Sequence, residues 1–175
     1  LRANAEKYHI DPQRIGAVGG SAGGHLVGLM ATASHIKKFQ GSGGNSQQSS
    51  QLQAAVVLAG PLELATGSVA EKSRKDPKNS NANKWFGKTI DQDPDLYRLA
   101  SPFTHVNKRT PPMLFMAGEF DYPERNQGTR DKLKALGIET GIIVVKGGKH
   151  GCWNREPWFS SMVQDMDKFF RRSLK

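Results

Sequence analysis

A serine between two pairs of glycines is the most informative feature of this sequence. Residues Gly19–Gly23 read G-G-S-A-G and fit the pattern G-x-S-x-G, with Ser21 at the centre. Ordered glycine costs conformational entropy, so glycines on both sides of one hydroxyl require a steric explanation. A serine hydroxyl is a poor nucleophile at neutral pH unless a base lies beside it and a third group orients that base. Ser21 is therefore a candidate nucleophile, although a phosphate-binding turn or a plain tight connection would also use such glycines.

Two other loops contain the side chains that such a nucleophile needs. Asp121 follows an apolar run almost directly and is the expected acid, with Glu119 as the alternative in the same loop. A structural alternative for Asp121 is a loop-capping or surface carboxylate. His150 lies in the glycine-rich segment Lys146–Gly151, after the next apolar run. Glycines around a histidine favour an exposed imidazole over a packed one, so His150 is the expected base.

The remaining histidines and the one cysteine have simpler explanations. His9 is expected at a helix end, His35 beside a polar loop, His105 in a connection, and His25 one helical turn after the serine, packed beneath it. No H-E-x-x-H or comparable spacing indicates a zinc site. The single cysteine, Cys152, excludes an internal disulfide and a multi-cysteine metal site. We expect Cys152 to be a buried small side chain, and we expect no metal.

The elements predicted around these residues alternate between strand and helix. Apolar runs typical of buried parallel strands occupy Arg14–Val18, Ala54–Ala59, Met113–Ala117 and Thr140–Val145. Helical patterns occupy Leu1–Tyr8, Gly24–Ala33, Pro94–Leu99, Arg125–Leu136 and Trp158–Arg172. This alternation predicts an α/β fold with a parallel sheet and flanking helices. The candidate serine, acid and histidine each follow one of the predicted strands, as groups that meet at one edge of a sheet would.

Two stretches depart from this alternation. Residues 34–50 are polar and of low complexity, and we expect a flexible surface loop there. Residues 62–107 show no sheet signal and contain a basic polar loop, expected at Glu71–Asn83, followed by Trp85-Phe86-Gly87.

Composition indicates a single globular domain. The chain has 175 residues, of which 37% are hydrophobic and 23% charged, and no apolar run approaches the roughly 20 residues that cross a bilayer. Its net charge of +9 comes from scattered Lys and Arg. Aromatic residues are not interleaved with these basic residues as in a single-strand binding platform, so nucleic acid is not an expected partner.

The motifs together resemble the C-terminal portion of an α/β-hydrolase of the carboxylesterase/lipase type, the group of hormone-sensitive-lipase-like and acetyl-xylan-esterase-like proteins. The resemblance rests on Asp11–Ile15, Gly19–Leu26, Asp95–Pro102, Pro111–Phe115 with Gly118 and Asp121, and His150–Gly151. It implies a nucleophile elbow at Ser21, with His150 as general base and then acid, and Asp121 orienting the imidazole. It also implies that the backbone N–H of Ala22 is an oxyanion donor and that no cofactor is needed.

The resemblance further implies a cap, formed by an insertion at about residues 62–98, over an acyl or alcohol pocket. Gly20, Trp85, Phe86 and Trp153 are candidates to line that pocket, with ordinary packing as the alternative for the aromatic residues. The family's HGGG-type oxyanion motif and its upstream strands do not occur in the sequence. We therefore expect residues 1–175 to be the C-terminal part of one domain, with an N-terminal half as a separate or missing segment. The strand at Arg14–Val18 would then have an unpaired apolar edge.

The leading functional hypothesis is a serine hydrolase that cleaves a small or medium carboxylic ester, including a sugar ester, through an acyl-serine intermediate. A serine peptidase or formamidase could use the same triad, because fold does not determine substrate. A second class is a non-catalytic or degenerate hydrolase-fold binding module, consistent with the missing HGGG-type motif and the basic charge.

Overall fold

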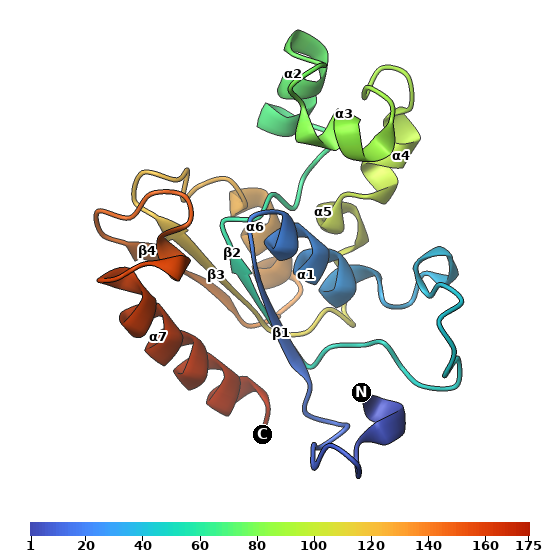
Figure 1. Ribbon diagram of the computed structural model, residues 1–175, viewed down its shortest axis with the longest axis vertical. Coiled ribbons are helices and arrows are strands. Elements are labelled where there is room, and N and C mark those ends of the chain that lie inside the picture. The colour runs from blue at the N-terminus through green and yellow to red at the C-terminus, as the bar shows by residue number, and fades with distance from the viewer.

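A computed structural model describes residues 1–175 and contains one parallel four-stranded sheet. Its strands are β1 (Gly16–Gly20), β2 (Ala54–Leu58), β3 (Met113–Gly118) and β4 (Thr140–Val145), and they lie side by side in chain order (Figure 1). The inner strands β2 and β3 are buried along their whole length, which explains their uninterrupted apolar sequences. The predicted α/β fold with a parallel sheet is confirmed.

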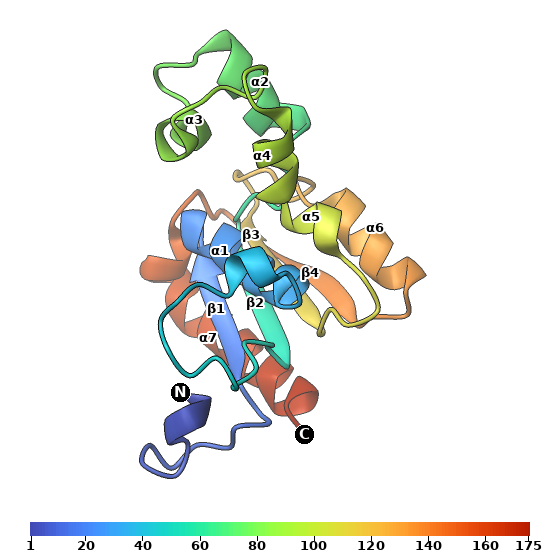
Figure 2. The same cartoon turned by 90° about the vertical axis from the view of Figure 1, so that its right-hand side faces the viewer.

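Helices cover both faces of the sheet. Helix α1 (Ala22–Ala33) and helix α6 (Gln127–Ala135) pack on one face, where Val27 and Leu133 meet Val57 and Phe115. Helix α7 (Trp158–Ser173) packs on the other face, where Met162 and Phe169 are buried (Figures 1 and 2). Successive residues of β2 point alternately into the hydrophobic cores on the two faces, because side chains alternate along a strand.

A group of short helices projects beyond the sheet (Figure 1). We call α2 (Gly67–Lys75), α3 (Asn81–Phe86) and α4 (Pro94–Leu99) the helical extension; α5 (Pro102–His105) follows it on the way to β3. The extension has its own small core around Tyr97 and a buried polar network in which Ser73 and Tyr97 hydrogen-bond to Asn83. The expected loop over Glu71–Asn83 is confirmed only for Asp76–Ser80, between α2 and α3. The expectation is wrong for the helical residues on either side, because a short helix that buries only Ala70 and Ser73 leaves little hydrophobic pattern in the sequence.

Element boundaries differ from the predictions at several other places. β1 starts two residues later than predicted and continues to Gly20, because Gly19 and Gly20 still pair with β2. The predicted helix at Leu1–Tyr8 is wrong: only a 3-10 turn over Arg2–Asn4 forms, and the following residues are turns. Within residues 34–50, which are mostly exposed, a single 3-10 turn forms over Lys37–Phe39.

β1 lies at the edge of the sheet and pairs only with β2. Its central residue, Val18, is 48% exposed, in agreement with the expected apolar edge. None of the helices combines the length and the apolar character that crossing a bilayer requires.

Glycines bring α1 into direct backbone contact with the loop after β2. A Cβ atom at Gly60 would lie 2.6 Å from the backbone nitrogen of His25 and equally close to the carbonyl carbon of Gly24. We expect Gly60→Ala to lower the free energy of unfolding by about 1–3 kcal/mol, because neither backbone can move freely. Urea denaturation measures this. Gly141→Ala in β4, where a Cβ meets nothing within 4 Å, is the matched control; equal stability of the two variants would contradict the prediction.

Candidate active site

Ser21 occupies a sharp turn between β1 and α1. Its backbone has φ 55° and ψ −119°, a conformation that non-glycine residues seldom adopt and that is held by the elements on both sides. The turn also requires glycine at position 19, because a Cβ atom there would overlap the carbonyl oxygen of Gly23. Gly19 therefore has a steric cause, whereas a Cβ atom at Gly23 would meet nothing within 4 Å. The turn presents the Ser21 hydroxyl at the carboxyl end of the sheet.

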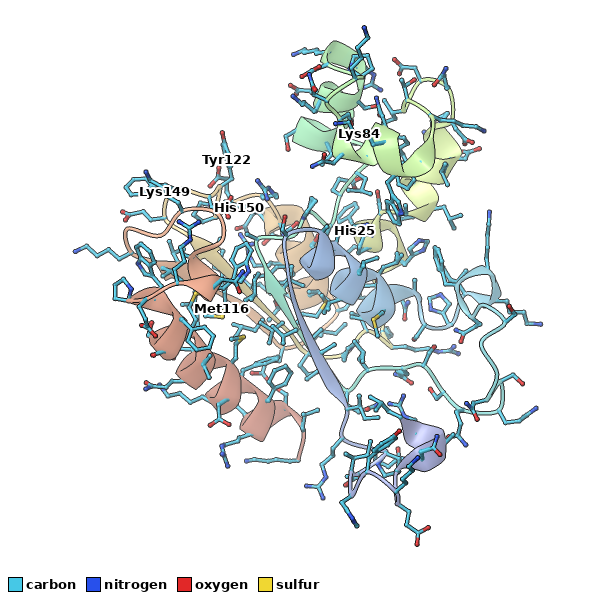
Figure 3. The ribbon with its side chains drawn as sticks, in the orientation of Figure 1. His25, Lys84, Met116, Tyr122, Lys149 and His150 are labelled. Carbon is cyan, nitrogen blue, oxygen red and sulfur yellow. The ribbon has the colours of Figure 1, made fainter.

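Three side chains that are distant in the sequence form one hydrogen-bonded chain. The Nδ1–H of His150 donates to Oδ2 of Asp121 (2.7 Å), and the Ser21 hydroxyl lies 2.9 Å from His150 Nε2. With its proton on Nδ1, the neutral imidazole offers Nε2 as the acceptor for the serine hydroxyl. The residues follow β1, β3 and β4, and His150 lies at the carboxyl end of the sheet in Figure 3.

The structure separates the two candidate acids. Asp121 is 5% exposed and directly faces His150. Glu119 instead accepts a hydrogen bond from the backbone N–H of Gly147 (2.8 Å), which ties the loop after β3 to the loop after β4. The two carboxylates therefore differ in what they contact, although they are only two residues apart.

Trp153 packs against the imidazole from the side. Its ring meets that of His150 edge to face, with centroids 5.1 Å apart and an interplanar angle of 82°. The same indole lies so close to the backbone of Gly20 that a Cβ atom there would be 2.5 Å from the indole nitrogen. Gly20 thus allows Trp153 to contact both the nucleophile turn and the histidine.

A cation lies beside the buried acid. Arg125 donates from Nη1 to the carbonyl of Ala59 (2.8 Å), and its Nη2 lies 3.9 Å from Oδ1 of Asp121. Arg125 therefore connects the acid loop to the end of β2 and places positive charge next to the carboxylate.

Cys152 is inert in this setting. It is 2% exposed, and burial raises the pKa of its thiol, with the Asp121 carboxylate adding to the shift. The thiol therefore stays protonated at neutral pH, in line with the expected small buried side chain.

A cavity of about 750 Å³ opens between Ser21 and the helical extension. Ala22, whose N–H at the first position of α1 has no partner within the helix, lines it beside the serine. His25, from α1, also lines the cavity. The other lining residues come from the loops after β2 and β3 and from the extension: Ala59, Pro61, Leu64, Ser68, Val69, Lys72, Asn79, Ser80, Asn81, Ala82, Trp85, Tyr122, Glu124 and Arg125.

Only one of the four proposed pocket residues lines this cavity. Trp85 does, whereas Gly20, Phe86 and Trp153 lie outside its lining, which corrects the expectation for those three. Phe86 packs between Trp85 and Tyr97 inside the extension. Gly20 and Trp153 pack against each other next to His150.

Sequence reasoning missed Tyr122 and Arg125 as residues beside the site. The available signal was their position in the same loop as Asp121, which leaves the carboxyl end of a parallel strand; Tyr122 is the next residue after Asp121 and Arg125 the fourth. The polar residues of α2 and α3 carried no such signal, because their helices were not predicted.

Comparisons with known proteins identify the family of the chain. The family described as BD-FAE matches residues 1–129. The chain belongs to the BD-FAE family. Membership and the solved structures below confirm the resemblance to α/β-hydrolase esterases that the motifs indicated.

The chain is similar in sequence to several proteins that are named esterases. Esterase LipC of Mycobacterium tuberculosis is 28% identical over 154 residues, which cover 86% of this chain and 38% of LipC. The versiconal hemiacetal acetate esterase of Dothistroma septosporum is 29% identical over 168 residues, covering 86% of this chain and 48% of that protein. The chain therefore spans less than half the length of these curated relatives.

Solved esterase structures share the fold. A truncated carbohydrate esterase from gut microbiota superposes with a TM-score of 0.80 at 28% identity, over 98% of this chain and 64% of that one. An esterase from Thermogutta terrifontis has a TM-score of 0.73 at 24% identity, over 96% and 58%. The second likeness concerns the fold alone.

Proposed function

We propose that this family member is a serine esterase that hydrolyses a carboxylic ester through an acyl-serine intermediate. The observation that carries the proposal is the continuous hydrogen-bonded chain from Ser21 through His150 to the buried Asp121. The names of its relatives, which are esterases and a carbohydrate esterase, support ester hydrolysis over peptide or formamide cleavage.

Acylation uses the three side chains in fixed roles. His150 Nε2 takes the proton from the Ser21 hydroxyl while Oγ attacks the ester carbonyl carbon, and the carbonyl oxygen becomes an oxyanion. The backbone N–H of Ala22 and the positive end of the α1 dipole stabilise that oxyanion. The imidazolium then gives its proton to the departing alcohol oxygen, which leaves the acyl group on the serine.

Deacylation repeats these steps with water as the nucleophile. His150 removes a proton from the water, the tetrahedral intermediate collapses, and the serine oxygen regains its proton as the acid leaves. Asp121 retains its negative charge throughout, keeps the Nδ1 tautomer in place and stabilises the imidazolium. Arg125 Nη2 lies 3.9 Å from Oδ1 of the same carboxylate.

In this proposal the helical extension acts as a cap over the substrate. The cavity beneath it has apolar walls at Leu64, Val69 and Trp85 and polar groups at Ser68 and Asn81. Such a lining suits a small or medium acyl group on a hydroxylated alcohol, so sugar esters are included among the proposed substrates.

Labelling with an organophosphonate ester tests the proposal. The reagent should add its phosphonyl group to Ser21, because only an activated serine attacks it. Intact-mass measurement and peptide mapping give the stoichiometry and the position of the label. Ser68, another serine of the cavity wall, is the internal control and should remain unmodified. An unlabelled chain, or a label retained by the His150→Ala variant at the same rate, would overturn the triad.

A further inference from the structure

The buried residue His25 has no place in the proposed proton transfer, yet it contacts both the cap and the segment that leads out of it. It lies one helical turn after Ser21 on α1 and is only 5% exposed. Its Nε2–H donates to the carbonyl of Ala100 at 2.7 Å. Its ring meets that of Trp85 edge to face, with centroids 5.5 Å apart and an interplanar angle of 82°, and both rings line the cavity.

Ala100 belongs to the connection that holds the cap. We call residues 60–66 and 99–103, which lead into and out of the cap, the neck. The neck's two segments are joined to each other: the Phe103 N–H donates to the Leu62 carbonyl (2.9 Å), and the Leu64 N–H donates to the Ser101 hydroxyl (2.9 Å). Because of these bonds, the entering and leaving segments hold the cap as one unit.

The neck rests on the helix that begins at the nucleophile. On the entering side, α1 approaches so closely that a Cβ atom at Gly28 would lie 2.9 Å from the side chain of Leu62. On the leaving side, the hydrogen bond from His25 to Ala100 joins α1 to the neck. Figure 3 shows His25 on the side of α1 that faces this connection.

The protonation state and tautomer of the His25 imidazole favour a stable hydrogen bond to Ala100. Burial lowers the pKa of His25, so the imidazole is neutral at neutral pH. Because Nε2 carries the proton that the Ala100 carbonyl accepts, the tautomer is set by the neck itself. A buried carbonyl that loses its donor is costly, so this bond strongly favours one orientation of the neck on α1.

We infer that His25 is a positioning residue: it fixes the cap, and with it Trp85, over Ser21 and thereby determines which esters fit the cavity. The inference rests on the proposed esterase function and adds a specificity determinant to it. Small esters that occupy only the space beside the triad do not need the cap. Esters with long or bulky groups must fill the cavity under Trp85, and their binding depends on the position of that ring.

The test compares two substrates in three variants of the full chain. His25→Phe keeps a ring against Trp85 but removes the donor to Ala100, and His25→Gln restores a donor of similar reach. His105→Phe is the matched control, because His105 Nε2–H also donates to a neck carbonyl, that of Leu99 (2.7 Å), but from α5 beside the neck, so the bond does not join the neck to α1. Its ring packs against Phe39 and does not line the cavity. The substrates are para-nitrophenyl acetate and para-nitrophenyl octanoate.

We expect His25→Phe to lower kcat/KM for the octanoate about 10-fold or more, mainly through KM, and to change the acetate value less than about 3-fold. His25→Gln should recover most of the octanoate activity, and His105→Phe should leave the ratio of the kcat/KM values for the two substrates unchanged.

Equal losses for both substrates in His25→Phe, or the same change in that ratio in His105→Phe, would overturn the inference. If His25→Phe does not fold, the two separate kcat/KM values of His25→Gln decide: values near those of the wild type for both esters support the inference, because a donor to Ala100 is then sufficient, and an equal loss for both esters rejects it. Failure of the esterase proposal can be distinguished from failure of this inference, because Ser21 of the wild type would then not react with the phosphonate.

Discussion

Replacing Ser21 by alanine is expected to lower the rate of ester hydrolysis by at least about 10⁴-fold, with little change in the fold. The substitution removes the hydroxyl that His150 activates for attack on the ester, while the backbone turn is held by contacts that alanine leaves intact. Hydrolysis of para-nitrophenyl acetate measures the rate, and circular dichroism with thermal unfolding checks the structure. Ser68→Ala, at another serine of the cavity wall, should keep nearly full activity.

Because the backbone at Ser21 is strained, the stability of variants at this position can be measured in addition to their activity. Ser21 has a φ of 55°, which glycine adopts without a Cβ clash. Ser21→Gly should therefore be inactive and yet at least as stable as Ser21→Ala, as expected if strain at the nucleophile is retained for function. Substantial hydrolysis by either variant would mean that Ser21 is not the nucleophile.

Replacing Asp121 by asparagine is expected to lower kcat by about 10⁴-fold at neutral pH. An amide facing Nδ1 donates a hydrogen bond where the carboxylate accepted one, so the imidazole turns to the tautomer with its proton on Nε2. That tautomer cannot accept the proton of Ser21, and a developing imidazolium has no anion beside it. Steady-state kinetics with a saturating ester gives kcat.

Glu119→Gln is the matched control for the acid. Its carboxylate binds the backbone of Gly147 and does not reach the histidine, so we expect a loss of less than about 10-fold. A large loss in Glu119→Gln together with a small one in Asp121→Asn would assign the acid to Glu119 instead. Burst kinetics would extend the test, because a variant impaired in acylation should show no rapid release of the first equivalent of nitrophenol.

Local patterns predicted much of this molecule. Uninterrupted apolar runs such as Ala54–Leu58 identified strands buried on both faces, because such residues are unfavourable in water wherever the chain places them. The motif around Ser21 predicted the strand–turn–helix, because only glycine fits where a Cβ atom at Gly19 would overlap Gly23. Of the three helices of the extension, α4 was predicted with its observed bounds, Pro94–Leu99, whereas α2 and α3 were not, because a short helix such as α3 buries too few side chains to leave a periodic signal.

The sequence by itself determined the parallel sheet, the sharp turn at Ser21 and the order in which serine, acid and histidine follow their strands. Only the tertiary structure showed that Asp121 and not Glu119 faces His150, and that Trp85 and not its neighbour Phe86 lines the cavity. The physical reason is the range of the interactions. A turn or a buried strand depends on adjacent residues, whereas the contact of Ser21 with His150 joins positions 129 residues apart, and its partners are selected by how sheet, loops and neck pack together.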